Sequence, residues 1–431
     1  MRSGRSHPLG LPTSSGAGFM ASGSRGASVT ALDRWLARKL VAAAGDAPVE
    51  VELWDGEVAH RAGPAPVGRL VFRDRGALLT CIFSPELGVG DSYAAGRLEI
   101  EGDLVSTIAA IYQAIETSGP RAFKRDLLGR LPRARRNTRD GSRAHIHHHY
   151  DLGNDFYRLW LDERMVYTCA YYPSPEATLE QAQVAKLDHV CRKLRLRPGQ
   201  RVVEAGCGWG ALALHMAAEY GVSVRAFNIS AEQVAFARER ARALGLDARV
   251  EFVEDDYRNI SGRFDAFVSV GMLEHVGLEH YEELGAVIDR ALATGGMGLV
   301  HSVGRSRPAP PNAWLEARIF PGSHPPSLGE MMRIFEPYRL DVLDVENLRL
   351  HYARTLTEWL ARFDRHLDGI RATYDDFFVR AWRLYLAGCA AAFRASTIQL
   401  FQVVFSRASN NALPCTRAHL YGADGPLWAV K

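Results

Sequence analysis

The sequence is poor in cysteine and has no long apolar run. Its 431 residues include six cysteines, scattered along the chain without a C-x-x-C pair. A chain of this length needs no disulfide staples, so we expect reduced thiols in a cytosolic protein. No uninterrupted apolar stretch approaches the roughly 20 residues that span a bilayer, so we expect no transmembrane helix.

Acidic residues are absent before Asp33, in a segment rich in Gly, Ser and Arg. The segment also lacks the apolar core of a secretory signal. We therefore interpret residues 1–30 as a disordered extension. A transit peptide and a start at Met20 are the alternatives.

Charge is nearly balanced overall, at +3, but it is unevenly distributed. Residues 121–143 hold nine basic residues against Asp126 and Asp140 and carry +7, which leaves −4 elsewhere. We call residues 121–144 the basic strip. It is either a passive linker or a contact with an anionic membrane, where each basic side chain contributes about 1 kcal/mol. With 47% hydrophobic and 23% charged residues, the chain can form two or three globular domains.

Residues 31–120 have the pattern of a small α+β module. Alternation of Val49, Val51 and Leu53 with glutamates predicts a strand, and residues 70–72, 78–83 and 96–102 are further candidates. Asp103 is placed to cap a helix that reaches about Ile115. Since no cluster of chemically active residues occurs here, we favour a binding module over a second catalytic unit.

From residue 145 to 431, strands alternate with helices, which is typical of a parallel sheet with right-handed crossovers. We expect strands over 201–205, 222–227, 250–253, 264–270 and 297–303, and helices over 211–220 and 230–244, the second with a capping box of Ser230 and Gln233. A late helix with one apolar face and a buried strand over 398–405 follow. The fold class is therefore α/β and doubly wound, with ligands beyond the carboxyl ends of the strands.

The first of these strands ends in a glycine-rich turn, Glu204-Ala205-Gly206-Cys207-Gly208-Trp209-Gly210. Glycine lets the backbone turn tightly and approach a ligand closely. The G-x-G-x-G spacing differs from the G-x-G-x-x-G of dinucleotide sites. Asn228-Ile229-Ser230 and Asp255-Asp256 follow the next two strands, where ribose and adenine contacts belong. We favour S-adenosylmethionine over a dinucleotide or an empty turn.

Several stretches in the same order resemble one known family. They are His149-Tyr150-Asp151-Leu152-Gly153-Asn154-Asp155-Phe156-Tyr157, Tyr167-Thr168-Cys169-Ala170-Tyr171-Tyr172, Glu204–Gly210, Val268–Gly277, Ala392-Phe393-Arg394 and Gln399–Arg407. Together they resemble cyclopropane-fatty-acyl-phospholipid synthases, over residues 147–407. The module before the basic strip looks, more loosely, like that family's N-terminal lipid-binding domain. The resemblance implies a Rossmann-like class I methyltransferase domain over 145–431.

The resemblance also implies an activity: transfer of a methylene group from S-adenosylmethionine to the cis double bond of an unsaturated phospholipid acyl chain. It implies a bound bicarbonate as the base, on a catalytic set of Cys169, Glu274, His301, the main chain of Val303, and Tyr352. The implied cofactor-binding residues are Tyr167, Thr168, Glu204, Gly206, Cys207, Gly208, Trp209, Gly210, Asn228, Ile229, Ser230, Gln233, Asp255 and Asp256. The implied setting is the inner face of an anionic membrane, and a second copy of the chain is a further candidate partner.

Simpler interpretations exist for each residue alone. Cys169 could be a buried apolar thiol, His301 a satisfied core histidine, Tyr352 a packing aromatic and Glu274 a turn cap. The family motifs favour the joint catalytic set. A zinc site at His145 and the His147–His149 run is disfavoured because no Cys or acid completes it.

Three alternative functions compete with this one. A nucleic-acid methyltransferase usually has an Asn/Asp-Pro-Pro-Tyr/Phe motif after the fourth strand, where Gly271-Met272-Leu273-Glu274 stands, so we expect no nucleic-acid partner. A lipid-carrier protein would not need the polar set. The third alternative, which the sequence does not exclude, is a relative that makes methyl-branched or methylene fatty acids. We also expect an acyl tunnel, partly lined by late aromatics that otherwise form core: Trp359, Phe363, Phe377, Phe378, Trp382 and Tyr385.

Overall fold

The computed structural model describes residues 28–118 and 152–421. The chain divides into two compact units, each assembled from separate stretches. Among the described residues, the first unit holds 28–118, 312–321 and 356–397, and the second holds 152–311, 322–355 and 398–421. The extension at 1–27, the basic strip and the histidine run lie outside the described residues.

The N-terminal part of the first unit is a four-stranded mixed sheet in the order β2-β1-β3-β4. The strands are β1 (Val49–Glu52), β2 (Val58–Arg61), β3 (Gly68–Phe72) and β4 (Leu98–Glu101), and the helices are α1 (Ala31–Ala43), α2 (Arg75–Phe83), α3 (Pro85–Ala94) and α4 (Leu104–Thr117). The predicted strands at 49–53, 70–72 and 96–102 are confirmed, as is the helix capped by Asp103, whose side chain accepts from the Ser106 N–H.

The prediction of a strand over 78–83 is wrong, because these residues form α2. The Asp74 side chain accepts a hydrogen bond from the Ala77 N–H at 2.9 Å and caps the helix at its start. A short apolar run does not distinguish a buried strand from a buried helix, so the capping aspartate was the decisive signal.

Helices from the late part of the chain complete the first unit. They are α11 (Ala313–Arg318), most of α13 (Arg349–Arg365), α14 (Leu367–Arg371) and α15 (Asp376–Arg394). Helix α15 packs against α3 and α4, and Arg380 donates to the Tyr93 carbonyl at 2.6 Å and to the Glu99 carboxylate at 2.9 Å. The late helix predicted from its apolar face is confirmed. Of the late aromatics named above, all except Phe377 are buried.

The second unit is built on a seven-stranded sheet in the order β10-β11-β9-β8-β5-β6-β7. The strands are β5 (Arg201–Ala205), β6 (Ser223–Asn228), β7 (Val250–Glu254), β8 (Phe264–Val270), β9 (Leu292–Gly304), β10 (Leu340–Asn347) and β11 (Gln399–Arg407). The helices are α6 (Asn154–Arg158), α7 (Leu179–Lys193), α8 (Ala211–Tyr220), α9 (Ala231–Ala243), α10 (Tyr281–Ala291), α12 (Leu328–Phe335) and α16 (Ala418–Tyr421). The short 3₁₀ turns are η3 (Tyr257–Asn259), η4 (Leu273–His275), η5 (Leu278–His280) and η6 (Glu336–Tyr338).

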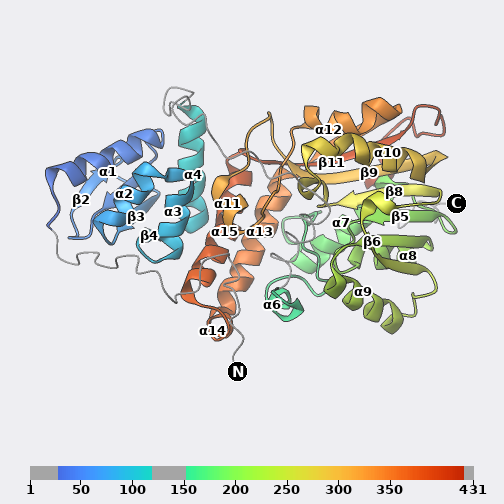
Figure 1. Ribbon diagram of the computed structural model, residues 1–431, viewed down its shortest axis with the longest axis horizontal. Coiled ribbons are helices and arrows are strands. Elements are labelled where there is room, and N and C mark those ends of the chain that lie inside the picture. Colours follow the sequence, from blue (N-terminus) through green and yellow to red (C-terminus); the bar gives the residue numbers. More distant parts are fainter. Residues whose placement is uncertain (1–27, 119–151, 422–431) are drawn as a thin grey trace. The chain divides into compact units, whose positions relative to one another are not determined.

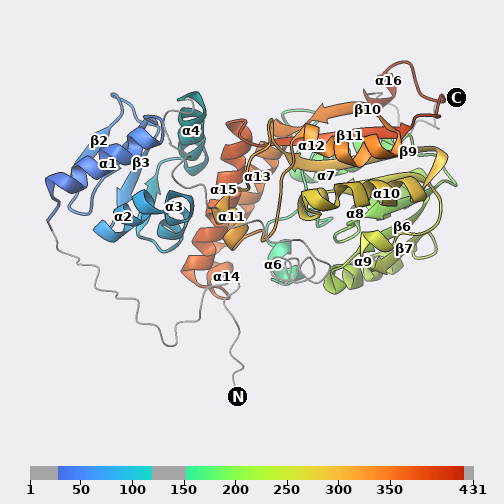
Figure 2. The same cartoon turned by 45° about the horizontal axis from the view of Figure 1, so that its top comes forward.

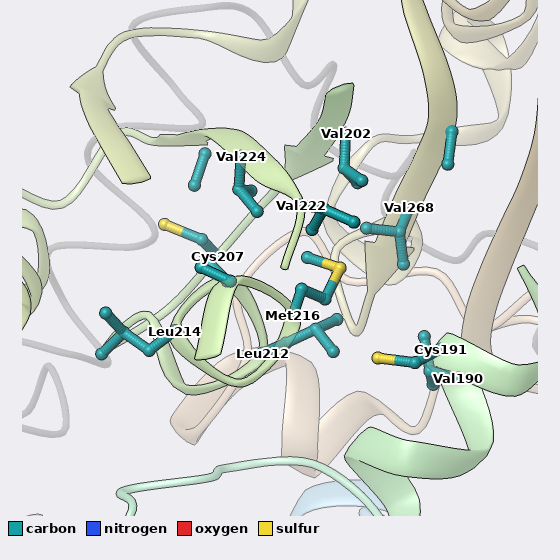
Figure 3. Close-up of a cluster of buried hydrophobic side chains, with 14 of the residues drawn as sticks. Val190, Cys191, Val202, Cys207, Leu212, Leu214, Met216, Val222, Val224 and Val268 are labelled. Atoms are coloured by element: carbon teal, nitrogen blue, oxygen red, sulfur yellow. The ribbon is translucent and has the colours of Figure 1, made fainter. Parts of the chain in front are cut away.

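Helices cover both faces of this sheet, as a doubly wound fold requires (Figure 1). On one face, Met216 of α8 lies between Val202 and Val268 of the sheet and Cys191 of α7 (Figure 3). On the other face, α10 and α12 pack against β8, β9 and β11. The doubly wound α/β prediction is therefore confirmed, and the glycine-rich turn lies at the carboxyl end of β5, an interior strand between β8 and β6.

The sheet differs from the prediction at one edge. Strand β11 runs antiparallel to both β9 and β10, and strand β10 was not predicted (Figure 2). Strand β10 carries Asp341, Asp344 and Glu346, and such charges are typical of an edge strand. Helix α9 is capped by Ser230, but the Gln233 side chain accepts from Asn228 instead of completing a capping box. No described helix has both the length and the hydropathy needed to cross a bilayer.

Candidate active site

The glycine-rich turn between β5 and α8 forms the floor of a cavity. Gly206, Gly208 and Gly210 all have positive φ, at +82°, +53° and +82°. A Cβ at Gly206 would lie 2.9 Å from the Met272 Cβ, and one at Gly210 would lie 2.6 Å from the Phe252 ring. Glycine is therefore required for both conformation and space at two of the three positions.

The cavity has a volume of about 150 Å³ and receives residues from the ends of β5, β6, β7 and β8. Every predicted cofactor residue lines it except Gly210 and Ser230. Gly210 is the N-cap residue of α8, and Ser230 caps α9, so both act on the walls of the cavity. The predicted lining residues are Tyr167, Thr168, Glu204, Gly206, Cys207, Gly208, Trp209, Asn228, Ile229, Gln233, Asp255 and Asp256.

Hydrogen bonds hold the polar wall of the cavity in place. The Asn228 amide donates to the Gly208 carbonyl at 3.2 Å and to the Gln233 side chain at 2.8 Å. Asp255 accepts from the Asp256 N–H and from the Asn259 side chain. The Asn228 side chain thus connects the end of β6 to the glycine-rich turn and holds the two segments in a fixed relative position.

Two of the buried titratable groups that line the cavity are Glu204 and Lys186. Oε2 of Glu204 is buried without a hydrogen-bond partner in the described residues, and burial raises the Glu204 pKa to about 8. Lys186, which no sequence motif singled out, lines the same cavity and donates to Thr168 Oγ1 at 3.0 Å. Burial lowers the Lys186 pKa to about 8. A ligand that carries both a cationic and an anionic group could pair with Glu204 and Lys186.

Trp209 closes one wall of the cavity together with aromatic residues of the early motif. Its indole N–H donates to the Asn154 side chain at 2.7 Å. Its ring lies 5.0 Å from Tyr157, which in turn lies 5.4 Å from Tyr167. The residues of two separate sequence motifs therefore meet in one wall.

Glu274 and Val303, two of the predicted catalytic residues, are in direct contact. Glu274 lies on η4 just after β8, and its Oε1 accepts the Val303 N–H at 2.6 Å. Its Oε2 is buried with no hydrogen-bond partner in the described part of the chain. Burial raises the pKa of Glu274 to about 7, although the Val303 N–H opposes that shift. The result is a carboxyl group poised to exchange a proton near neutral pH.

His301 lies two residues before Val303 on β9 and is fully buried. Its Nδ1 lies 3.0 Å from the side-chain nitrogen of Gln402 on β11, the residue directly opposite in the antiparallel register. Burial, together with the charges of Lys186 and Lys193, lowers the pKa of His301 well below its usual value. His301 is therefore a neutral imidazole at physiological pH.

The Cys169 side chain and the main chain of Tyr352 contact the same main-chain carbonyl. The buried Cys169 thiol lies 3.9 Å from the Leu348 carbonyl, which also accepts the Tyr352 N–H at the start of α13. The Ala170 N–H donates to Thr355 Oγ1 at 3.1 Å, which joins the segment to the same helix. Burial raises the Cys169 pKa far above its ordinary value, so this thiol stays protonated.

The sequence analysis did not identify Gln402, a buried polar residue that contacts His301. The side-chain carbonyl of Gln402 accepts from Lys193 Nζ at 2.7 Å, and Lys193 pairs with Glu346 at 2.6 Å. The available signal was a glutamine within the apolar run of β11, which is fully buried. No group of three or more potential metal ligands occurs among residues 28–118 and 152–421. The histidines at 145 and 147–149 lie outside these ranges.

Comparison with known proteins identifies relatives over most of the chain. The family model described as mycolic acid cyclopropane synthetase matches residues 137–403, and a domain of unknown function, DUF7884, matches residues 36–119. The chain is 41% identical to the cyclopropane-fatty-acyl-phospholipid synthase of Escherichia coli K12, over 77% of this chain and 86% of that protein. It is 36% identical to a probable fatty acid methyltransferase of Pseudomonas putida, over 87% of this chain and 96% of that protein.

Solved structures agree with these matches. The cyclopropane synthase MmaA2 of Mycobacterium tuberculosis superposes with a TM-score of 0.59 at 28% identity, over 62% of this chain and 98% of that chain. The mycolic acid cyclopropane synthase CmaA1, in complex with SAH and CTAB, gives a TM-score of 0.58 at 29% identity with the same coverage. Fold, cavity and relatives together place this chain in the cyclopropane synthase family of S-adenosylmethionine-dependent methyltransferases.

Proposed function

We propose that the protein transfers a methylene group from S-adenosylmethionine to the cis double bond of an unsaturated phospholipid acyl chain and so forms a cyclopropane ring. The observation that carries this proposal is the buried Glu274 carboxyl, whose Oε1 is fixed by the Val303 N–H and whose Oε2 lacks a partner in the described residues. Two synthases named for cyclopropane products are among the relatives, which supports the same chemistry.

The cavity residues fit the cofactor. Glu204 has a buried, unpartnered oxygen that suits the ammonium of the methionine moiety, and Lys186 suits its carboxylate. Asp255 and Asp256 follow β7, at the edge where hydroxyl groups of a ribose would be bound. When bound, the cofactor supplies an electrophilic methyl group.

The residues around Glu274 suit the second half of the reaction. An alkene that accepts a methyl group becomes a carbocation, which water would quench, so the surrounding residues must exclude water. Ring closure then needs a positioned base. We propose that a bicarbonate ion is held by Glu274, His301, Tyr352 and the Cys169 segment, and that it supplies this base. Burial of an anion costs several kcal/mol unless its oxygens are hydrogen-bonded, so a site of this kind needs several polar groups.

In this arrangement Glu274 accepts a proton and His301 donates a hydrogen bond. The raised pKa of Glu274, about 7, makes it a competent proton acceptor near neutral pH. The Cys169 thiol, kept protonated by burial, contributes its segment and no negative charge.

Substitution Glu274→Gln is expected to leave the affinity for S-adenosylhomocysteine unchanged and to reduce turnover at least about 100-fold, the scale of general acid–base catalysis. Calorimetric titration and product assays measure the two quantities. Normal turnover would contradict the role of Glu274.

A second candidate product follows from the relatives named as fatty acid methyltransferases. The same cation could lose its proton elsewhere and give a methylene acyl chain or a methyl-branched chain that keeps a double bond. The buried Glu274 and His301 favour ring closure, because Glu274, on η4 after β8, accepts the N–H of Val303, which lies two residues beyond His301 on β9.

One experiment separates these products. The protein is incubated with labelled S-adenosylmethionine and vesicles of unsaturated phospholipid, and the lipids are identified by mass spectrometry. A product heavier by one CH₂ and without a double bond supports the cyclopropane synthase. A product that keeps its double bond supports the methylene alternative, and unchanged lipid contradicts both.

We further propose that the enzyme docks peripherally on the inner, anionic face of a membrane through the basic strip. The support is the concentration of +7 in residues 121–143 of a chain whose net charge is +3. Electrostatic docking of this kind is reversible and requires no membrane span.

A further inference from the structure

Within the second unit, a hydrogen-bonded chain of four polar side chains begins next to His301. It consists of Gln402 on β11, Lys193 on α7 and Glu346 on β10, with His189 on α7 at its far end. Gln402, Lys193 and His189 are at most 3% exposed. None of these four residues belongs to the proposed catalytic set, so their burial calls for a separate explanation.

Burial lowers the pKa of Lys193, and the neighbouring Glu346 opposes that shift and favours the charged form. Its Nζ lies 2.6 Å from Glu346 Oε2, and His189 donates to the same oxygen at 2.6 Å. These two donors hold the pKa of Glu346 down to about 2. The anion therefore persists at physiological pH and keeps Lys193 as an ammonium, which has three donors and no acceptor.

The charge of Lys193 sets the orientation of the Gln402 amide. An ammonium can only donate, so the amide oxygen must face Lys193, at 2.7 Å. The amide NH₂ then has to face His301 Nδ1, at 3.0 Å. The reverse orientation would place two donors against each other at buried positions, where each unsatisfied donor costs about 1–3 kcal/mol.

The amide in turn sets the tautomer of His301. Since the Gln402 NH₂ only donates, Nδ1 of His301 must accept, and the ring proton must reside on Nε2. We infer that Lys193 and Gln402 fix His301 as the neutral Nε2–H tautomer, which makes it an obligatory hydrogen-bond donor toward the bound anion and excludes it as the base of the reaction. This inference rests on the proposed function for its catalytic meaning. The tautomer itself does not depend on that function.

The surrounding charges support the same assignment. The charged groups that act on His301 are Lys186 and Lys193 on α7 and Glu346 on β10. Two of the three are cations, and with burial they disfavour an imidazolium. Strand pairing supplies the geometry, because Gln402 is the residue opposite His301 in the β9–β11 register. Lys193 and Gln402 are thus positioning residues for His301.

The test is NMR of the full-length enzyme labelled with ¹⁵N-histidine, without cofactor or lipid. Signals lost in His301→Ala assign the ring nitrogens. The wild type is expected to show a protonated Nε2 and an unprotonated Nδ1 at every pH from about 6 to 9, since burial and two cations disfavour the imidazolium. Lys193→Met is expected to release the amide and give a mixture of tautomers, and Lys193→Arg to restore the single form. Gln402→Glu, whose carboxylate accepts, is expected to place the proton on Nδ1.

Gln399→Leu is the matched control, because Gln399 is a buried glutamine on the same strand whose amide pairs with Asn347 and Ser306. It should keep the wild-type tautomer. Turnover on unsaturated phospholipid should fall at least about tenfold in Lys193→Met and Gln402→Glu, as expected for a lost charge-assisted or buried hydrogen bond. It should recover in Lys193→Arg.

Three outcomes would overturn the inference. They are a wild-type Nδ1–H tautomer, a single Nε2–H tautomer that survives in both Lys193→Met and Gln402→Glu, and a Gln402→Glu enzyme with the reversed tautomer but unchanged turnover. A wild-type enzyme that leaves the lipid unmodified would instead contradict the proposed function. The tautomer readout would stand in that case.

Discussion

At the scale of single residues, Glu274 makes stability depend on pH. Its pKa is raised to about 7 in the folded protein, above the value near 4.5 of an exposed glutamate. Folding therefore takes up a proton between these pH values, and the free energy of unfolding falls as pH rises through this window. Above pH 7 the loss is complete and amounts to about 3 kcal/mol, at 1.36 kcal/mol for each pH unit.

Glu274→Gln removes this pH dependence, because glutamine has no charge to bury. We expect the variant to gain stability relative to the wild type between pH 5 and pH 8, by up to about 3 kcal/mol. Urea unfolding followed at both pH values measures the difference. Glu282→Gln on α10, where the carboxylate is exposed, is the control and should show no such gain. If the difference in the free energy of unfolding between Glu274→Gln and the wild type does not change with pH, the argument from burial of Glu274 is wrong.

Sequence motifs named the residues of the candidate site, but they did not predict how those residues pair. Motifs placed Glu274, His301 and Cys169 in the set, and the structure gives each a buried position. The partners were hidden because they come from strand register and helix packing, which sequence patterns do not resolve. Gln402 faces His301 only because β11 runs antiparallel to β9. No sequence motif singled out Lys186 or Lys193, and only packing reveals that they are buried.

At the scale of elements, the turn between β5 and α8 offers a matched pair of glycines. Gly206 and Gly208 both have positive φ, but a Cβ lies 2.9 Å from Met272 only at Gly206. Gly208→Ala is expected to cost about 1–2 kcal/mol for the left-handed backbone alone. Gly206→Ala carries the same cost plus the clash, so it should lower the melting temperature further. Thermal unfolding of the two variants measures this, and equal losses would contradict the role assigned to Met272.

The elements themselves were largely predictable where periodicity was strong. Strands β5 and β8 and helix α8 were expected at their observed bounds, because apolar runs end at glycine or at capping residues. Prediction failed for α2, where an apolar run is compatible with either state, and for β10, whose charges conceal an edge strand. The direction of β11 was also missed, because a strand buried on both faces reads the same whether parallel or antiparallel.

At the scale of the molecule, the first unit depends on helices from the other end of the chain. The α4 residues Leu104, Val105 and Ile108 are buried, and α15 packs on α4 and α3. A fragment of residues 28–118 would expose this surface and lose the bonds that Arg380 makes to Tyr93 and Glu99. We therefore expect the fragment to lack a cooperative thermal transition, although a family model matches residues 36–119 alone.

Fusion of residues 356–397 to that fragment should restore a cooperative transition, which circular dichroism can follow. A fragment of 28–118 that melts cooperatively by itself would show that α15 is dispensable for this unit. Comparing the two fragments shows whether the domain matched over residues 36–119 folds alone or also needs residues 356–397.

The basic strip allows a test of membrane binding by the whole molecule. Neutralising Arg133, Arg135 and Arg136 lowers the charge of the basic strip from +7 to +4. At about 1 kcal/mol for each basic residue near an anionic leaflet, binding to anionic vesicles should weaken by about two orders of magnitude. Vesicle sedimentation with and without anionic lipid measures it. Unchanged binding would support the passive-linker alternative.

The central pairing of β9 with β11 also sets the order in which the protein can be built. Roughly 95 residues separate the end of β9 at Gly304 from the start of β11 at Gln399. A ribosome adding about 5–20 residues per second takes roughly 5–20 s to cover that distance. During that interval the nascent chain carries β9 as an open edge, which is prone to pair with other chains. His301 therefore acquires its partner Gln402 only when synthesis is almost complete, and a chain arrested before residue 399 is both inactive and prone to aggregate.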